Sequence, residues 1–300
     1  MKITVSVQTL QPPKPGQPDP WPLLVKRFTE HGPGPRDYIL LNEYVEPWAD
    51  DDTPLAERAL TDLGMKALIP PKPRGSSCVV LYNPDTVGEP TPDILRGETV
   101  HHDRTQETIC GWALGWWMLP IGSGRTAKSA PIGVCSFKFC PWSVDGAKIA
   151  AAHTATHPFQ GGPFAIAGGD GNFLTARQRF EPRPNWRGQS QYNIGARAHL
   201  WTARLPFKIA NRSVARQFLA KGWRDCGYEL ARRTRDRGLL VPTHGDGLGR
   251  IDWQLCTDPM ADSIIGYETV AAPEGGSDHF EPVVTYDLER VDATADLRWT

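Results

Sequence analysis

Alternation of apolar and polar side chains identifies the strands that the sequence predicts. Residues 3–9 (ITVSVQT) alternate with a period of two, which is typical of a strand with one buried face. Short runs that are apolar almost throughout predict strands buried on both faces. We expect such strands at residues 37–44, 78–82, 111–119, 132–139, 163–168, 250–256, 264–270 and 281–288.

Helices are predicted between these strands. Thr53 and Pro54 begin one helix that ends before Gly64, and Ser143 is the expected N-cap of another that runs to about residue 153. An amphipathic pattern predicts a helix at 214–223, and a short helix is expected at 23–28. Strands and helices mix throughout, without a repeat or a clear boundary. We therefore expect residues 1–300 to form one α/β domain built on packed sheets.

Composition places the chain among ordinary globular proteins, because 40% of its 300 residues are hydrophobic and 22% are charged. No run of 18 apolar residues predicts a membrane span. The first residues alternate like a strand and lack the continuous apolar segment of a signal peptide, so we expect a cytoplasmic protein. The six cysteines are scattered without a C-x-x-C pair, and we expect buried, reduced thiols.

The formal net charge of −1 conceals an uneven distribution. Residues 174–237 contain fifteen Lys or Arg against four Asp or Glu, so the rest of the chain is acidic. Trp186, Trp201 and Trp223 are interleaved with these basic residues. A solvated face explains such a segment, and so does a polyanionic partner whose bases stack on the indole rings.

Polar side chains occur at the ends of several predicted strands. Glu43 ends one strand, Asp170 and Asn172 follow another, and Asp252 lies in a third. The pair Asp278-His279 precedes a fourth. Strand ends are rigid positions for a site, and Mg²⁺ binds one or two carboxylates together with substrate phosphate oxygens.

These segments resemble the motifs of the endonuclease/exonuclease/phosphatase superfamily, which has the fold of pancreatic deoxyribonuclease. The similar segments, in family order, are DYILLNE (37–43), GGDGN (168–172), FLAKGWRD (218–225), GRIDW (249–253) and GSDHFEPV (276–283). Each segment alone is weak, but together they extend over nearly the whole chain. The resemblance implies a four-layer sandwich, in which two packed mixed β-sheets are flanked by helices.

The resemblance also implies the metal ligands. Glu43 would hold Mg²⁺ or Mn²⁺, and Asp278 would be a second ligand or a hydrogen-bond acceptor. The family's first strand normally ends in a metal-binding Asn. This chain has Gln8 or Thr9 there, and the alignment does not choose between them. Gln8 retains the amide and is the first candidate ligand, whereas Thr9 would supply only a hydroxyl.

The other site residues would act on the phosphate and on the attacking water. Asp170 would accept a proton from the water and Asn172 would orient it. Asp252 would orient His279 toward a phosphate oxygen. Lys138 stands where relatives often carry His, and its ammonium would neutralise a phosphate oxygen without shuttling a proton near neutral pH.

We therefore expect a metal-dependent phosphoesterase, with a nuclease as the first choice. A phosphatase or phosphodiesterase of small or lipid phosphates and a catalytically silent phosphate-binding module are the alternatives. The expected partner is nucleic acid or another phosphate ester, and neither a membrane nor an obligate protein partner is expected. His153 and His157 have the spacing of a zinc pair, but surface histidines at a helix end are the favoured interpretation. We assign His244, in THGDGLGR, to a loop.

Overall fold

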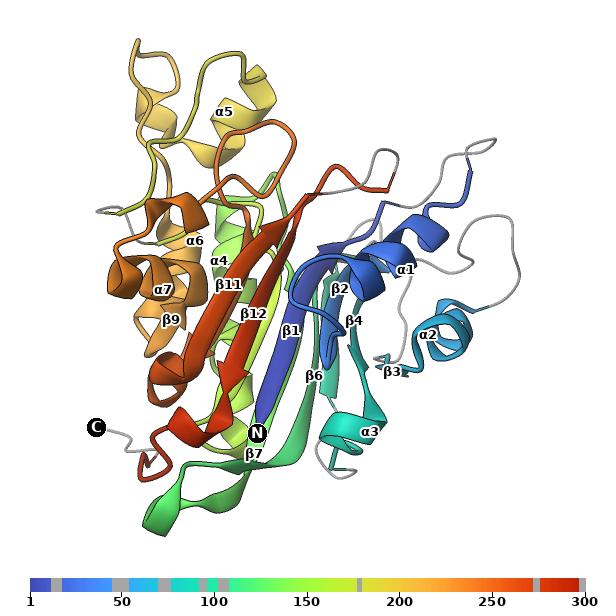
Figure 1. The fold of residues 1–300 in the computed structure, drawn as a ribbon. Helices are drawn as coiled ribbons and strands as arrows, with labels where there is room; N and C mark the ends of the chain where they lie inside the picture. Colours follow the sequence, from blue (N-terminus) through green and yellow to red (C-terminus); the bar gives the residue numbers. More distant parts are fainter. Residues whose placement is uncertain are drawn as a thin grey trace.

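Two six-stranded sheets pack against each other in the computed structural model, which describes residues 1–11, 18–44, 54–69, 77–91, 96–101, 108–176, 180–271 and 276–296 (Figure 1). The first sheet has the order β11 (Ile264–Val270), β12 (Glu281–Asp287), β1 (Lys2–Thr9), β2 (Tyr38–Tyr44), β4 (Ser77–Tyr82), β3 (Lys66–Leu68). The second has the order β5 (Arg96–His101), β6 (Thr108–Ile121), β7 (Lys128–Lys138), β8 (Ala165–Asp170), β10 (Asp252–Thr257), β9 (Trp223–Asp225).

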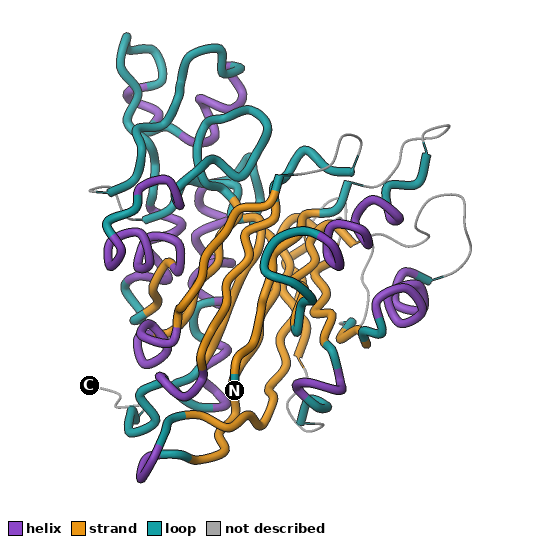
Figure 2. The backbone as a smooth tube through the Cα atoms, viewed as in Figure 1, coloured by secondary structure: helices purple, strands orange, loops and turns teal. Residues whose placement is uncertain are grey.

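Helices lie on the outer sides of the two sheets (Figure 2). The described helices are α1 (Trp21–Glu30), α2 (Leu55–Leu63), α3 (Pro84–Val87), α4 (Val144–Thr154), α5 (Gln191–Arg197), α6 (Ser213–Leu219) and α7 (Cys226–Thr234). Short 3₁₀ turns are η2 (Gly124–Thr126), η3 (His157–Gly161), η4 (Leu200–Thr202), η5 (Arg237–Leu239), η6 (Asp258–Ser263) and η7 (Leu288–Arg290). No helix of the described ranges is long and apolar enough to cross a membrane.

Three apolar clusters hold the layers together. Ile3, Val5 and Val7 pack against Val134 and Ile166 between the two sheets. The outer face of the first sheet packs against α1 and α2, and the outer face of the second packs against α4 and α6. Both sheets are mixed, because β1–β2 and β7–β8 are parallel pairs and the other pairs are antiparallel. The predicted four-layer sandwich is confirmed.

Two adjacent glycines let β8 lie close to its neighbours. A Cβ atom on Gly168 would collide with Cγ2 of Val7, in the opposite sheet. A Cβ atom on Gly169 would collide with the carbonyl oxygen of Phe137, in the adjacent strand β7. The glycines that precede Asp170 are therefore required by packing, and they place the end of β8 directly against β1 and β7.

The end of one predicted helix was wrong. The amphipathic pattern predicts a helix through Trp223, but α6 ends at Leu219 and Trp223 begins β9. Gly222 lies between them with a φ of +79°, a left-handed conformation that ends the helix. Trp223 is 1% exposed and packs in the core, so it is not available to stack on a ligand. The described cysteines are buried free thiols, as predicted, and the side chain of Cys110 lies outside the description.

A buried ion-pair cluster anchors the start of β12. Oε1 of Glu281 lies 3.0 Å from Nε of Arg36, and Oε2 lies 3.8 Å from Nε of Arg27. The guanidinium of Arg27 makes no hydrogen bond to any described residue. Its burial lowers the pKa of Arg27 to about 10, although Glu281 opposes this shift. Glu281 is therefore the carboxylate that compensates two buried cations.

We predict that Glu281→Gln destabilises the fold by about 3–5 kcal/mol, because it leaves two buried guanidinium groups without a counter-charge. Urea denaturation followed by circular dichroism measures the change. Glu289→Gln is the matched control, since the Glu289 side chain is 67% exposed and its loss should change stability by no more than about 0.5 kcal/mol. Equal midpoints for the two variants would show that Glu281 does not anchor the fold.

Candidate active site

All but one of the predicted site residues meet at one edge of the two sheets, the exception being Gln8. The parallel strands β1 and β2, and likewise β7 and β8, end at this edge, and the antiparallel strands β10 and β12 begin there. Register places Asp252 opposite Asp170 and Asp170 opposite Lys138. Ligand atoms of Asp170, Asp252 and His279 all lie within 4.8 Å of one another. Residues scattered over more than 100 positions of sequence thereby form one polar cluster.

The centre of this cluster is a buried aspartate–histidine pair. Nδ1 of His279 lies 2.9 and 3.0 Å from the two carboxylate oxygens of Asp252. The hydroxyl of Thr9 donates a 3.0 Å hydrogen bond to Asp252 Oδ1. Burial lowers the pKa of His279, but the carboxylate of Asp252 outweighs this effect and the net shift is upward. The pair thus favours an imidazolium whose Nε2 points away from Asp252.

Asp252 does not pair with the neighbouring Arg250. Arg250 bonds instead to Asp225 and Glu181, and Nη1 of Arg250 lies 2.9 Å from Asp225 Oδ1. Asp225 also caps α7 through the backbone N–H of Tyr228. Arg250 and Asp225 are therefore structural, and the carboxylate of Asp252 is directed to His279.

Asp170 and Asn172 are held together by the turn that joins them. The backbone N–H of Asn172 donates to Asp170 Oδ1 at 2.9 Å, and its side-chain Nδ2 donates to Oδ2 at 2.8 Å. Asn172 adopts a φ of +55°, which asparagine tolerates better than most residues. Burial raises the pKa of Asp170, while His279 and Lys138 oppose the shift. A carboxylate with a raised pKa is suited to accept a proton.

Glu43 and Lys138 form an ion pair across the two sheets, between β2 and β7. The register of β2 against β4 shifts between Leu41 and Tyr44, and Glu43 has a φ of +60° within this bulge. Bulges of this kind redirect a side chain at the end of a strand. Nζ of Lys138 also lies 4.0 Å from Asp170 Oδ2, and burial lowers the pKa of this lysine.

The structure does not bring Gln8 to the cluster. Val7 contacts the opposite sheet, so the period of two directs Thr9 to the same side and Gln8 to the outer face. Gln8 is fully buried, and its Nε2 donates to the carbonyl oxygen of Thr9. The strand-end side chain that reaches the site is therefore the hydroxyl of Thr9.

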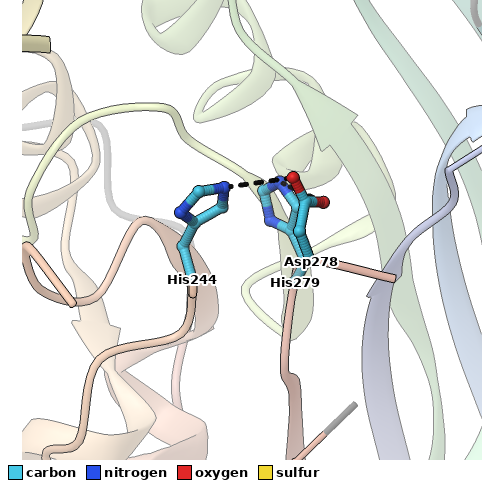
Figure 3. A group of neighbouring side chains, drawn as sticks. All are labelled: His244, Asp278 and His279. Atoms are coloured by element: carbon cyan, nitrogen blue, oxygen red, sulfur yellow. Dashed lines mark ion pairs between the residues drawn. The ribbon is translucent and has the colours of Figure 1, made fainter. Parts of the chain in front are cut away.

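A residue assigned to a loop by the sequence also lies at the site. His244 Nε2 is 3.4 Å from Asp278 Oδ2, and His244 Nδ1 is 3.3 Å from Asp246 Oδ1 (Figure 3). Its ring packs edge-on against His279, with 4.8 Å between the ring centroids. Burial lowers the pKa of His244, but Asp246 and Asp278 raise it to about 10. Nothing local in THGDGLGR distinguishes this histidine, because a backbone bridge between residues 244 and 279 creates the contact.

The basic segment has both buried and exposed parts. Arg197 and Arg212 are buried and bond to backbone carbonyl groups of residues 172 and 175. Arg183 and Arg187 are exposed, whereas Arg177 and Arg179 lie outside the described residues. Trp201 is 66% exposed, and Trp186 packs partly against a small apolar cluster. The segment that carries α5 extends beyond the strand ends, at the same end of the molecule as the site (Figure 1).

His153 and His157 do not form a metal group with a third ligand among the described residues. Their ring centroids are 5.9 Å apart, and His157 stacks on Trp112 at 4.9 Å.

Comparison with known proteins identifies the fold. No protein-family model matches the chain, and no curated protein matches its sequence. Solved structures match over almost its full length. An endonuclease/exonuclease/phosphatase family protein from Bacteroides thetaiotaomicron is 12% identical, with a TM-score of 0.55 and coverage of 96% of each chain. The 3′ phosphatase NExo from Neisseria, bound to a product DNA hairpin, is 13% identical, with a TM-score of 0.58 and coverage of 95% of this chain and 99% of NExo.

ANGEL2, a 2′,3′-cyclic phosphatase, is 10% identical, with a TM-score of 0.59 and coverage of 96% of each chain. The chain has the fold of the endonuclease/exonuclease/phosphatase superfamily, so the fold that its motifs imply is confirmed.

We predict that Arg197 holds the Asp170–Asn172 turn in place. Its Nε donates to the carbonyl oxygen of Asn172 at 2.8 Å, and its Nη1 donates to Asn193 Oδ1 at 2.6 Å. Arg197→Met should destabilise the fold by about 2–3 kcal/mol, because hydrogen bonds from a buried charged group are lost. It should also speed amide hydrogen exchange at residues 171–174. Arg187→Met, at an exposed position, should change neither quantity. Unaltered exchange in the Arg197 variant would contradict the prediction.

Proposed function

We propose that this chain is a metal-dependent phosphoesterase that hydrolyses phosphodiester bonds by in-line attack of water. The observation that carries the proposal is the cluster of Asp170, Asp252 and His279 at the shared strand edge. A proton-accepting carboxylate and a carboxylate-oriented histidine at this spacing suit activation of water and stabilisation of negative charge on phosphate.

The donor groups at the site fit a divalent cation. Glu43 and Asp278 present carboxylate oxygens, the ligands that Mg²⁺ and Mn²⁺ prefer. Lys138 is the only described cation paired with Glu43, and it experiences the negative charge of Asp170, Asp252 and Asp278. Glu43 and Asp278 would hold the ion. Its chemistry, when bound, is to polarise a phosphate oxygen.

Each side chain at the site then has a separate role in the reaction. Asp170 accepts the proton of the attacking water, and Asn172 fixes the carboxylate of Asp170 through two hydrogen bonds. His279 donates from Nε2 to a nonbridging phosphate oxygen, because Asp252 holds Nδ1. Lys138 adds a positive charge beside the same phosphate. Thr9 takes the position that the sequence assigns to Gln8, and it acts by holding Asp252.

The surface around the site supports a nucleic acid as the substrate. Tyr192 lies on α5, and Trp201 and Phe207 follow it along the chain; these three side chains are 54–66% exposed. Trp142, just before α4, is 64% exposed. Exposed rings in a segment that also carries exposed arginines such as Arg187 suit stacking of bases beside a phosphate backbone. This arrangement favours a nuclease over a phosphatase of small phosphates, which needs no extended stacking surface.

Hydrolysis is predicted to require Mg²⁺ or Mn²⁺ and to be lost in Glu43→Ala, because that variant removes a carboxylate ligand. Turnover of single-stranded DNA, RNA and a small phosphodiester should be measured with each ion and with a chelator. Glu30→Ala is the control, since this glutamate is exposed on α1. Full activity in excess chelator would refute metal dependence.

We predict that Asp252 and His279 act as one catalytic unit, so that the losses of kcat in Asp252→Ala and His279→Ala do not add. Each should lower kcat by about 100- to 1000-fold, corresponding to about 3–4 kcal/mol of transition-state stabilisation. The double variant should lose little more than either single variant, because a histidine without its orienting carboxylate is already misplaced.

This double-mutant cycle should be measured on the phosphodiester that is hydrolysed fastest, with folding checked by circular dichroism. Losses that add in free energy would show that the pair does not act as a unit. A wild-type protein that binds nucleic acid but never hydrolyses it would instead identify a silent binding module.

A further inference from the structure

We propose that His244, Asp278 and His279 form a binding site for a divalent transition-metal ion of the Zn²⁺ type. Figure 3 shows the two imidazole rings beside the Asp278 carboxylate, with the histidines carried by separate segments. Ligand atoms of these three residues lie within 4.8 Å of one another. Two histidines and one carboxylate are a common ligand set of catalytic zinc sites.

The spacing of the ligand atoms suits one ion. Asp278 Oδ2 lies 3.4 Å from His244 Nε2, and Asp278 Oδ1 lies 3.9 Å from His279 Nε2. Two ligands of a tetrahedral ion, each at 2.0–2.1 Å from the metal, are separated by about 3.4 Å. The Asp278 side chain is 53% exposed, so a small rotation can bring its oxygen toward both rings.

In each histidine, Nδ1 faces a carboxylate, on the side of the ring away from Asp278. Nδ1 of His279 faces Asp252 at 2.9 Å, and Nδ1 of His244 faces Asp246 at 3.3 Å. When Nδ1–H donates to a carboxylate, the lone pair of Nε2 is free to bind a metal, and metal-binding histidines generally have such a partner. The backbone N–H of Asp246 also approaches His244 Nδ1, at 3.1 Å, which suits the other tautomer. Binding of the ion through Nε2 requires the first of these two tautomers, in which Nδ1–H of His244 donates to the Asp246 carboxylate.

The two histidines are held in place by the backbone. Residues 244 and 279 form an antiparallel bridge. The N–H of Phe280 donates to the Thr243 carbonyl at 2.8 Å, and the N–H of Gly245 donates to the Asp278 carbonyl at 2.9 Å. Thr243 is fully buried, and its hydroxyl accepts the N–H of Asp252 at 2.9 Å. Ligands fixed by such contacts need little ordering when the ion binds.

The two imidazoles determine which ion this site prefers. Imidazole nitrogen suits zinc, cobalt and other transition metals, whereas Mg²⁺ prefers oxygen ligands. Glu43 is not a member of the group, so this site differs from the carboxylate ligand set of the proposed hydrolysis, although both include Asp278. Nε2 of His279 cannot bind the ion and donate to phosphate at the same time, so an ion at this site would compete with the proposed hydrolysis. The inference does not rest on the proposed function, because the ion would bind whether or not the chain hydrolyses a phosphoester.

The test is metal binding by the full chain without substrate. The chelator-treated protein should be titrated with Zn²⁺ by calorimetry, and with Co²⁺ by visible absorption as a probe of the ligands. We expect one ion per chain. His244→Ala should weaken Zn²⁺ binding by at least 100-fold. Asp246→Asn should weaken it by about 10- to 100-fold, as loss of a hydrogen-bond partner behind a metal ligand does.

His153→Ala is the matched control, because this exposed histidine belongs to the other pair with zinc-like spacing. It should bind Zn²⁺ as the wild type does, and so should Glu43→Ala. Three results would overturn the proposal: no Zn²⁺ binding by the wild type, wild-type affinity in folded His244→Ala, or a thiolate charge-transfer band in the Co²⁺ spectrum that places the ion on cysteine. Loss of hydrolysis in Glu43→Ala with Zn²⁺ binding intact would separate the two sites.

Discussion

The carboxylate of Asp252 joins the two sheets where the site is formed. It belongs to the second sheet, yet it accepts hydrogen bonds from Thr9, at the end of β1, and from His279, just before β12, both in the first sheet. The side chain is 1% exposed. A buried carboxylate costs several kcal/mol in lost hydration unless it is fully hydrogen-bonded. The two sheets therefore have to meet in one alignment for this group to be satisfied, and that alignment also orients the histidine.

Unusual backbone conformations direct two further side chains at the site, those of Glu43 and Asn172. Glu43 and Asn172 both adopt left-handed conformations, which cost free energy for residues other than glycine. Glu43 lies near the end of β2, and Asn172 follows the end of β8 by two residues. One redirects a carboxylate from β2 toward Lys138, and the other folds an amide back onto Asp170. Strain and buried charge thus occur together at the strand edge, while the apolar clusters beneath provide the stability that offsets them.

Charge at the site is organised around a few cations among several carboxylates. Lys138 lies between Glu43 and Asp170, His279 faces Asp252, and His244 lies between Asp246 and Asp278. Each of these cations lies beside at least one carboxylate, while Asp170 and Asp252 remain near each other, with ligand atoms within 4.8 Å. The hydrogen bond from His244 lowers the pKa of Asp278 to about 2, so this half-exposed group stays ionised near neutral pH.

The sequence by itself determined nine of the twelve described strands and the polar groups at their ends, because periodicity and strand-end chemistry are local properties. It missed β3, β5 and β9, which carry no clear apolar run. It placed Asp170, Asn172, Asp252 and His279 correctly as polar groups at strand ends, and their order identified the fold. It could not choose between Gln8 and Thr9, because the direction of a side chain at a strand end depends on which face meets the other sheet. Trp223 was wrongly assigned to a helix, because Gly222 ends α6 before it. His244 lies in a loop, as predicted, but the sequence did not connect it with the site, because only a backbone bridge to residue 279 brings it there. Only tertiary packing decides such contacts, since they join segments that share no local pattern.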